Sequence, residues 1–223
     1  EHEQDEADWA EEQAVMDPRI KGIIPTAPLE RGEDVRPILE KITANPRVKG
    51  IRRLIQFEED IKFCLRPDFV KGVQLLSDYN LSFDICISHI QMANVIKMVA
   101  RCPEVSFILD HIGKPDIRNQ LLYPWKDELK TLAGFGNVSC KMSGLVNEAD
   151  WDNWTPDNLR PYIGHVLECF GWDRVIFGGD WPVCQLASPV RRWFDTLVDT
   201  LSGSSTDELR KLFHDNAISF YRL

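Results

Sequence analysis

The stretch SFILDHIGKP, Ser106–Pro115, decides the fold prediction. Its first four residues suit a strand that is apolar on both faces, and such strands are typical of parallel sheets covered by helices. An acid, an imidazole, a glycine, a lysine and a proline follow at once. The abrupt change has two interpretations: a solvated loop, or a strand tip that opens into a catalytic site.

Similar apolar, β-branched runs recur along the chain. They begin at Ile20, Val48, Ser82, Val105, Val138 and Val175. Their spacing of roughly 23 to 37 residues is that of a βα unit, and helical patterns fill the gaps. The sequence therefore predicts an α/β fold with a parallel sheet, as either an open doubly wound sheet or a (β/α)8 barrel. The absence of a GxGxxG fingerprint disfavours one version of the open sheet. Without a linker to divide it, the chain is predicted to be a single domain, residues 1–223.

Bulk composition excludes some classes of partner. The 223 residues carry a formal net charge of −9, which repels a phosphate backbone, so we expect no nucleic-acid partner. No apolar run reaches the roughly 20 residues that a membrane span needs, so we expect no membrane partner. The six cysteines are scattered without a CxxC pair, which predicts reduced thiols and a cytoplasmic protein.

Charged and imidazole side chains gather where these runs end. They are Arg52, His89, Asp110, His111, Lys114, Lys141 and Asp180. In both candidate architectures the carboxyl ends of the strands form the ligand site. Lys141 lies within a strand pattern, where a lysine must be paired or have a lowered pKa. Strand alternation places His111 on the face of Phe107 and Leu109, at the rim of the core.

Each of these side chains also has a plainer interpretation. His111 can be a structural histidine at a strand end, and His89 can begin the next helix. Asp110 can cap a loop, Asp180 can form a turn before Trp181-Pro182, and Lys141 can lie at a distorted edge. All of them at the same end of one sheet favour a functional site.

Imidazoles and a carboxylate at such a site suit two kinds of chemistry. They can hold a divalent ion with an open position, or one of them can act as general base on water. Arg52 and Lys141 can then hold a polar or anionic carbonyl substrate, with Lys114 a further candidate for substrate binding. The residues alone predict hydrolysis of an ester-like or amide-like carbonyl.

Five motifs in this order are similar to those of a known family: VKGIRR, SFDICISHIQM, SFILDHIGKPDI, CKMSGLVNEADW and RVIFGGDWPVC. The chain resembles the amidohydrolase-2 branch of the amidohydrolase superfamily over essentially its whole length. The most similar subgroup is that of sugar-lactone and pyrone-dicarboxylate lactonases, including L-rhamnono-γ-lactonase-like proteins. The resemblance implies a distorted (β/α)8 barrel that opens a sugar-derived lactone with activated water, in carbohydrate metabolism.

The resemblance also implies roles for individual residues. Asp180 would be the general base or metal-linked acid/base, and His111 would lie near the scissile carbonyl or metal. Arg52 and His89 would bind substrate, with Lys141 and Trp181 lining the pocket. The subgroup implies either no cofactor or one zinc-like divalent cation, held here by His111 and Asp180. The expected partner is a small lactone or related carboxylate, and no oligomeric state is predicted.

The sequence departs from the family in one respect. The family's first strand carries a His-x-His pair, which is absent here, and about six strands are recognisable. We therefore expect the chain to lack the first two strands of the barrel, with Glu1 inside the helix after the second. Two alternative functions stay open: a decarboxylase of the same superfamily, and an inactive remnant with a binding role only.

Overall fold

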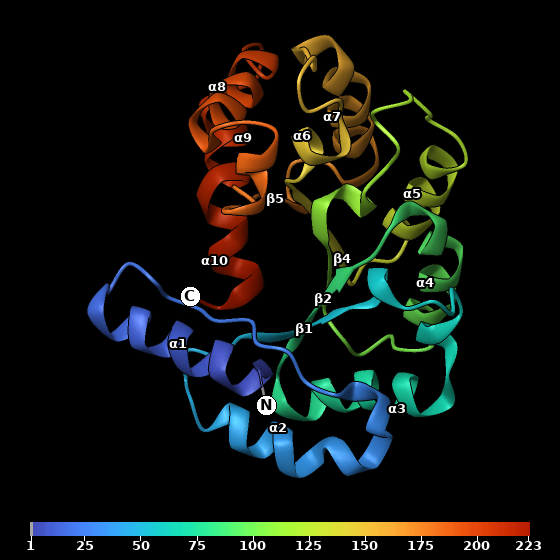
Figure 1. Cartoon of the computed structure of the whole chain (residues 1–223), viewed down its shortest axis with the longest axis vertical. Coiled ribbons are helices and arrows are strands. Elements are labelled where there is room, and N and C mark those ends of the chain that lie inside the picture. Colours follow the sequence, from blue (N-terminus) through green and yellow to red (C-terminus); the bar gives the residue numbers. More distant parts are fainter. Residues whose placement is uncertain (1) are drawn as a thin grey trace.

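The computed structural model describes residues 2–223, with side chains from residue 8 onward. Five strands form one parallel sheet in chain order: β1 (Gly50–Leu54), β2 (Ser82–Cys86), β3 (Phe107–Leu109), β4 (Val138–Met142) and β5 (Val175–Phe177). Ten α-helices are described: α1 (His2–Met16), α2 (Arg36–Thr43), α3 (Pro67–Leu75), α4 (Met92–Val99), α5 (Trp125–Ala133), α6 (Leu145–Glu148), α7 (Pro156–Phe170), α8 (Val190–Thr200), α9 (Thr206–Arg210) and α10 (Asn216–Tyr221). Figure 1 shows α3, α4, α5 and α7 following one another along the outer side of the strands. The predicted α/β class with parallel strands is confirmed.

The sheet has five strands, and the first predicted run, from Ile20, forms an extended segment instead of a sixth. Ile23 makes an isolated parallel bridge to Val48, and the Arg52 amide donates to the Pro25 carbonyl at 3.0 Å. Proline has no amide hydrogen, so Pro25 and Pro28 cannot donate to a ladder and regular pairing stops there. The segment still lies beside β1 in the position that a sixth strand would take.

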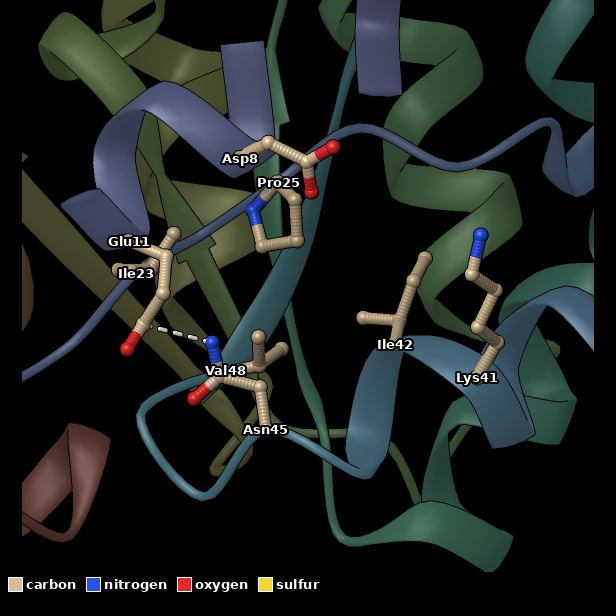
Figure 2. A pocket seen from close by; sticks show the side chains of 8 residues that line it. All are labelled: Asp8, Glu11, Ile23, Pro25, Lys41, Ile42, Asn45 and Val48. Carbon is tan, nitrogen blue, oxygen red and sulfur yellow. Dashed lines mark hydrogen bonds between the residues drawn. The ribbon is translucent and has the colours of Figure 1, made fainter. Parts of the chain in front are cut away.

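Helix α1 is fastened beside this segment (Figure 2). The Asn45 side-chain amide donates to the Glu11 carboxylate at 2.7 Å, and Arg47 pairs with the same carboxylate at 2.5 Å. Glu11 therefore ties α1 to the loop between α2 and β1. The helix predicted at the start of the chain is present over His2–Met16, and Glu1, which was predicted to lie inside it, is outside the described residues.

The outer face of the strands packs on the helices through a row of phenylalanines. The ring centroid of Phe83 in β2 lies 6.1 Å from that of Phe69 in α3 and 6.1 Å from that of Phe107 in β3. Both pairs have edge-to-face geometry. Each ring is fully buried, and pairs of this kind add about 0.5–1.5 kcal/mol beyond area burial. Because side chains alternate along a strand, the neighbours of these residues point to the inner face.

The inner face carries charge. Arg52 in β1 is in register with Asp84 in β2, and Lys141 projects from β4 toward the same space, where it contacts Asp84. The carboxyl-terminal helix α10 reaches this space from the side of β5, and the Tyr221 hydroxyl donates to Asp84 at 2.7 Å. Figure 1 shows α10 lying between β5 and the amino-terminal segment.

None of the described helices is long and apolar enough to cross a membrane.

Close contact between α3 and the turn before α2 depends on a glycine. A Cβ atom on Gly72 would lie 2.0 Å from the Leu29 carbonyl oxygen, whereas a Cβ on Gly164 in α7 would meet nothing within 4 Å.

We expect Gly72→Ala to lower the free energy of unfolding by roughly 1–3 kcal/mol, because the backbone of α3 or of the turn at Leu29 must move to make room for the methyl group. Gly164→Ala, the matched control, should raise it by roughly 0.5–1 kcal/mol, since alanine favours helix. Urea unfolding of the two variants checks this, and equal effects would contradict the packing described.

Candidate active site

A partly buried lysine joins two fully buried carboxylates at the centre of the inner face. Lys141 Nζ donates to Asp110 Oδ1 at 2.5 Å and to Asp84 Oδ2 at 2.9 Å. Asp84 and Asp110 are 1% and 0% exposed. Burial alone would lower the pKa of Lys141, but the two carboxylates raise it well above its ordinary value. Lys141 is therefore a permanent cation that makes the burial of two acids possible.

Asp110 also faces the guanidinium of Arg52. Arg52 Nε lies 3.2 Å from Asp110 Oδ2. Burial opposes ionisation of Asp110, but the cations of Lys141 and Arg52 lower its pKa below the ordinary value. Asp84 differs, because burial outweighs Lys141 and raises its pKa. Arg52 also donates to Cys86 Sγ at 3.4 Å, so five side chains from β1, β2, β4 and the end of β3 meet in one cluster.

His111 lies just above this cluster. Its Nδ1 shares a hydrogen bond with Ser143 Oγ at 2.9 Å, and its Nε2 lies 3.6 Å from Asp180 Oδ1. Burial lowers the pKa of His111 to about 3, so the imidazole is neutral near pH 7. The prediction that strand alternation sets its direction was wrong: β3 ends at Leu109, and His111 has a φ of 53°. A left-handed backbone after the strand re-aims the ring.

Two glycines make room for the side chains of His111 and Ser143. Gly144 has a φ of 71°, and a Cβ atom there would lie 2.7 Å from the Cβ of His111. A Cβ on Gly178 would lie 2.8 Å from the Cβ of Ser143. Only glycine leaves space for the histidine and the serine to meet.

Asp180 follows β5 and has a φ of 52°. Burial raises its pKa above the ordinary value, although the cations of Lys114 and Arg52 oppose the rise. A carboxylate with a raised pKa is a better proton acceptor than an ordinary one. The carboxylate therefore combines a mouth position with the basicity that proton abstraction needs.

The remaining predicted residues lie around this centre. Lys114 Nζ donates to Gln56 Oε1 at 2.5 Å, and His89 Nδ1 is 2.9 Å from the Lys114 carbonyl oxygen. The structure thus brings Arg52, Lys141, His111 and Asp180 together and joins His89 to Lys114. Trp181, which was predicted to line the pocket, is different, because this residue is 65% exposed.

Sequence reasoning missed Asp84, Tyr221 and Gly144. An acid inside the apolar run SFDICI was a visible signal for Asp84, of the same kind that singled out Lys141. Tyr221 gave no signal, because its contact with Asp84 joins residues 137 apart in the sequence. Gly144 could be recognised only once the direction of the His111 ring was known.

A divalent ion needs several ligand atoms that converge and are not already paired with cations. Among the described residues, Cys86, Asp110 and His111 bring ligand atoms within 4.8 Å of one another. Arg52 and Lys141 already pair with Asp110, and burial raises the pKa of the Cys86 thiol. His111 and Asp180 add two donor atoms, whereas a catalytic zinc site uses three protein ligands. The described residues do not fit a resident zinc ion, and the predicted metal stays a prediction.

Comparison with known proteins gives consistent matches. The family model described as Amidohydrolase matches residues 2–223. The L-fucono-1,5-lactonase of Burkholderia multivorans is 32% identical over 176 residues, covering 71% of this chain and 60% of that protein. The L-rhamnono-gamma-lactonase of Scheffersomyces stipitis is 27% identical over 235 residues, covering 92% and 69%. The chain spans 60% to 69% of the length of its curated relatives.

Solved structures share the fold. A Burkholderia multivorans amidohydrolase with bound zinc superposes with a TM-score of 0.91 and 29% identity, covering 99% of this chain and 80% of that one. A 2,6-dihydroxybenzoate decarboxylase superposes with a TM-score of 0.66 and 13% identity, covering 99% and 76%. The second likeness concerns the fold alone. The suspected resemblance to amidohydrolases and lactonases is confirmed.

Removing the central cation should destabilise the protein. Lys141→Met leaves Asp84 and Asp110 buried without their shared partner, and we expect a loss of about 3–5 kcal/mol in the free energy of unfolding. Lys211→Met is the matched control, since Lys211 pairs with Asp173 at the exposed surface and should contribute little. Urea unfolding at pH 7 measures both. A Lys141→Met variant as stable as the control would show that the buried pairs do not hold the sheet together.

Proposed function

Because the chain belongs to the amidohydrolase family, we propose that the protein is a lactonase, which opens the ring of a sugar-derived lactone with water. The pairing of His111 Nε2 with Asp180 Oδ1 at 3.6 Å carries this proposal. It supplies a neutral imidazole and a basic carboxylate at the mouth of the sheet. Lactonases among the relatives support the same reaction.

Asp180 is the general base. It accepts a proton from a water molecule, and the water oxygen adds to the carbonyl carbon of the lactone. The bond between the carbonyl carbon and the ring oxygen then breaks. The proton held on Asp180 passes to the ring oxygen, so that one lactone and one water give one hydroxy acid.

His111 positions Asp180 and the water. When Ser143 donates its hydroxyl hydrogen to Nδ1, the hydrogen on Nε2 faces the Asp180 carboxylate. Burial keeps the ring neutral, so His111 does not neutralise the base by forming a salt bridge with it. The Ser143 hydrogen bond fixes both the tautomer and the ring direction.

Arg52 and Lys114 stabilise the negative charge that develops on the carbonyl oxygen. The Arg52 side chain is 36% exposed, and Lys114 acts electrostatically on Asp180. Charges placed in advance around a partly buried site favour the transition state over the ground state. Lys141 is committed to Asp84 and Asp110, so it contributes by holding Asp110 against Arg52. His89 orients Lys114 through the Lys114 carbonyl, and Trp181 forms part of the outer rim.

The alternatives carry less support. The decarboxylases share the fold at 13% to 15% identity, and no contact in the described site favours release of carbon dioxide over addition of water. A binding-only remnant would not need Asp180 and His111 in contact.

We propose the cytoplasm as the location of the protein. All six cysteines lie in the described part of the chain as free thiols, as is typical of proteins in a reducing compartment.

Replacement of Asp180 tests the mechanism. Asp180→Asn removes the proton acceptor while keeping the size of the side chain, and kcat for a sugar 1,5-lactone should fall by at least about 100-fold. Asp173→Asn, on the exposed surface before β5, is the matched control and should keep wild-type kcat. Acid release in a pH-stat gives the rates, and urea unfolding shows that both variants are folded. Wild-type kcat in folded Asp180→Asn would remove Asp180 from the mechanism.

A further inference from the structure

A hollow lies at the same end of the sheet as His111 and Asp180, between the loops that follow β2, β3 and β4. Its volume is about 270 Å³. The residues that line it are Ser88, His89, Asp116, Arg118, Asn147, Glu148, Ala149 and Trp151. The mechanism proposed above uses only His89 of this set, and only for its contact with Lys114.

Hydrogen bonds between the loops hold the walls in place. The Arg118 amide donates to the Glu148 carbonyl at 2.8 Å, which joins the loop after β3 to the one after β4. The Trp151 indole donates to the Asn147 carbonyl at 2.7 Å. These bonds do not require a ligand, so the hollow is largely formed before binding, as is usual for small-molecule sites.

The hollow adjoins the catalytic pair. The Asn147 side-chain amide donates to the Val183 carbonyl at 2.8 Å, and Val183 lies three residues after Asp180. Lys114, whose carbonyl contacts His89, acts electrostatically on Glu148 and on Asp180 alike. A substrate whose carbonyl lies at Asp180 therefore has this hollow as the next space along the mouth.

The lining suits hydroxyl groups. Carboxylates accept hydrogen bonds from hydroxyls, Arg118 donates to them, and the half-exposed Trp151 ring offers an apolar face for the C–H side of a sugar. The formal charges of Asp116, Glu148 and Arg118 sum to about −1, which disfavours a second carboxylate on the substrate. The pattern fits a neutral polyhydroxylated ligand.

The same lining does not form a cation site. Asn119 Nδ2 donates to both carboxylate oxygens of Asp116, at 3.0 and 2.9 Å. Within the described residues, the ligand atoms of Asp116, Glu148 and His89 do not converge as a group that could hold an ion. Burial raises the pKa of Glu148, which suits a carboxyl group that bonds hydroxyls rather than a metal ion.

We propose that this hollow is the subsite for the hydroxyl-bearing part of the lactone, and that Glu148 is a specificity-determining residue within it. The inference rests on the proposed lactonase function. It assigns the choice between a polyhydroxylated lactone and a plain one to the loops after β3 and β4. The catalytic pair is common to both substrates.

Two lactones with the same six-membered ring separate recognition from chemistry: an aldono-1,5-lactone and δ-valerolactone, which has no hydroxyl groups. We expect Glu148→Gln to raise KM for the aldono-lactone at least about tenfold, since a hydroxyl loses its charged acceptor. Its kcat/KM for δ-valerolactone should stay within about twofold of wild type. Glu104→Gln, on an exposed turn at the opposite end of the sheet, is the matched control and should change neither.

Other outcomes overturn the subsite. Equal losses on both lactones would place Glu148 in the chemistry or the fold, and unchanged kinetics on both would remove it from recognition. A wild-type protein that hydrolyses neither lactone defeats the proposed function instead. Calorimetric titration with a polyhydroxylated six-membered lactam then tests the hollow alone: binding that Glu148→Gln weakens at least about tenfold supports the subsite, and the absence of binding to wild type overturns it.

Discussion

The cation of Lys141 between the buried carboxylates of Asp110 and Asp84 is the constraint on which the rest of the inner face depends. A parallel sheet with helices on one side normally fills its other side with apolar residues. Here two carboxylates lie there at 0% and 1% exposure, and each would be strongly unfavourable alone. The lysine offsets the cost of burying both carboxylates. Because Lys141 is in β4, Asp84 is in β2 and Asp110 follows β3, the ion pairs also link these three strands.

The catalytic geometry is built upward from this ion pair. Asp110 is held by Lys141 and in turn holds Arg52 at the mouth. The residue after Asp110 is His111, whose left-handed backbone directs its ring toward Ser143 and Asp180. Fixing Asp110 therefore fixes the start of the turn that aims the imidazole. The imidazole meets the Ser143 hydroxyl because Gly144 and Gly178 leave the space for the two side chains.

Much of this arrangement could be predicted from the sequence. Apolar runs with β-branched residues gave the parallel strands, and the ionisable residues after them gave most of the site, because the carboxyl ends of parallel strands lie together whatever the details. Local conformation could not be predicted so well. Alternation failed at His111, since the strand ends two residues earlier, and the segment from Ile20 did not form a strand, since Pro25 cannot donate to its neighbour. The Tyr221 contact with Asp84 depends on how α10 folds back, which no local pattern records.

Isotope labelling shows whether water adds to the carbonyl carbon of the lactone, because it reports where the water oxygen enters the substrate. The protein would be given an aldono-1,5-lactone in water enriched in oxygen-18, with the uncatalysed reaction subtracted, and the product analysed by mass spectrometry. We expect one oxygen-18 in the carboxylate of the product and none in its new hydroxyl group. Label in the hydroxyl group, or no hydrolysis above the uncatalysed rate, would contradict addition of water to the lactone carbonyl at Asp180.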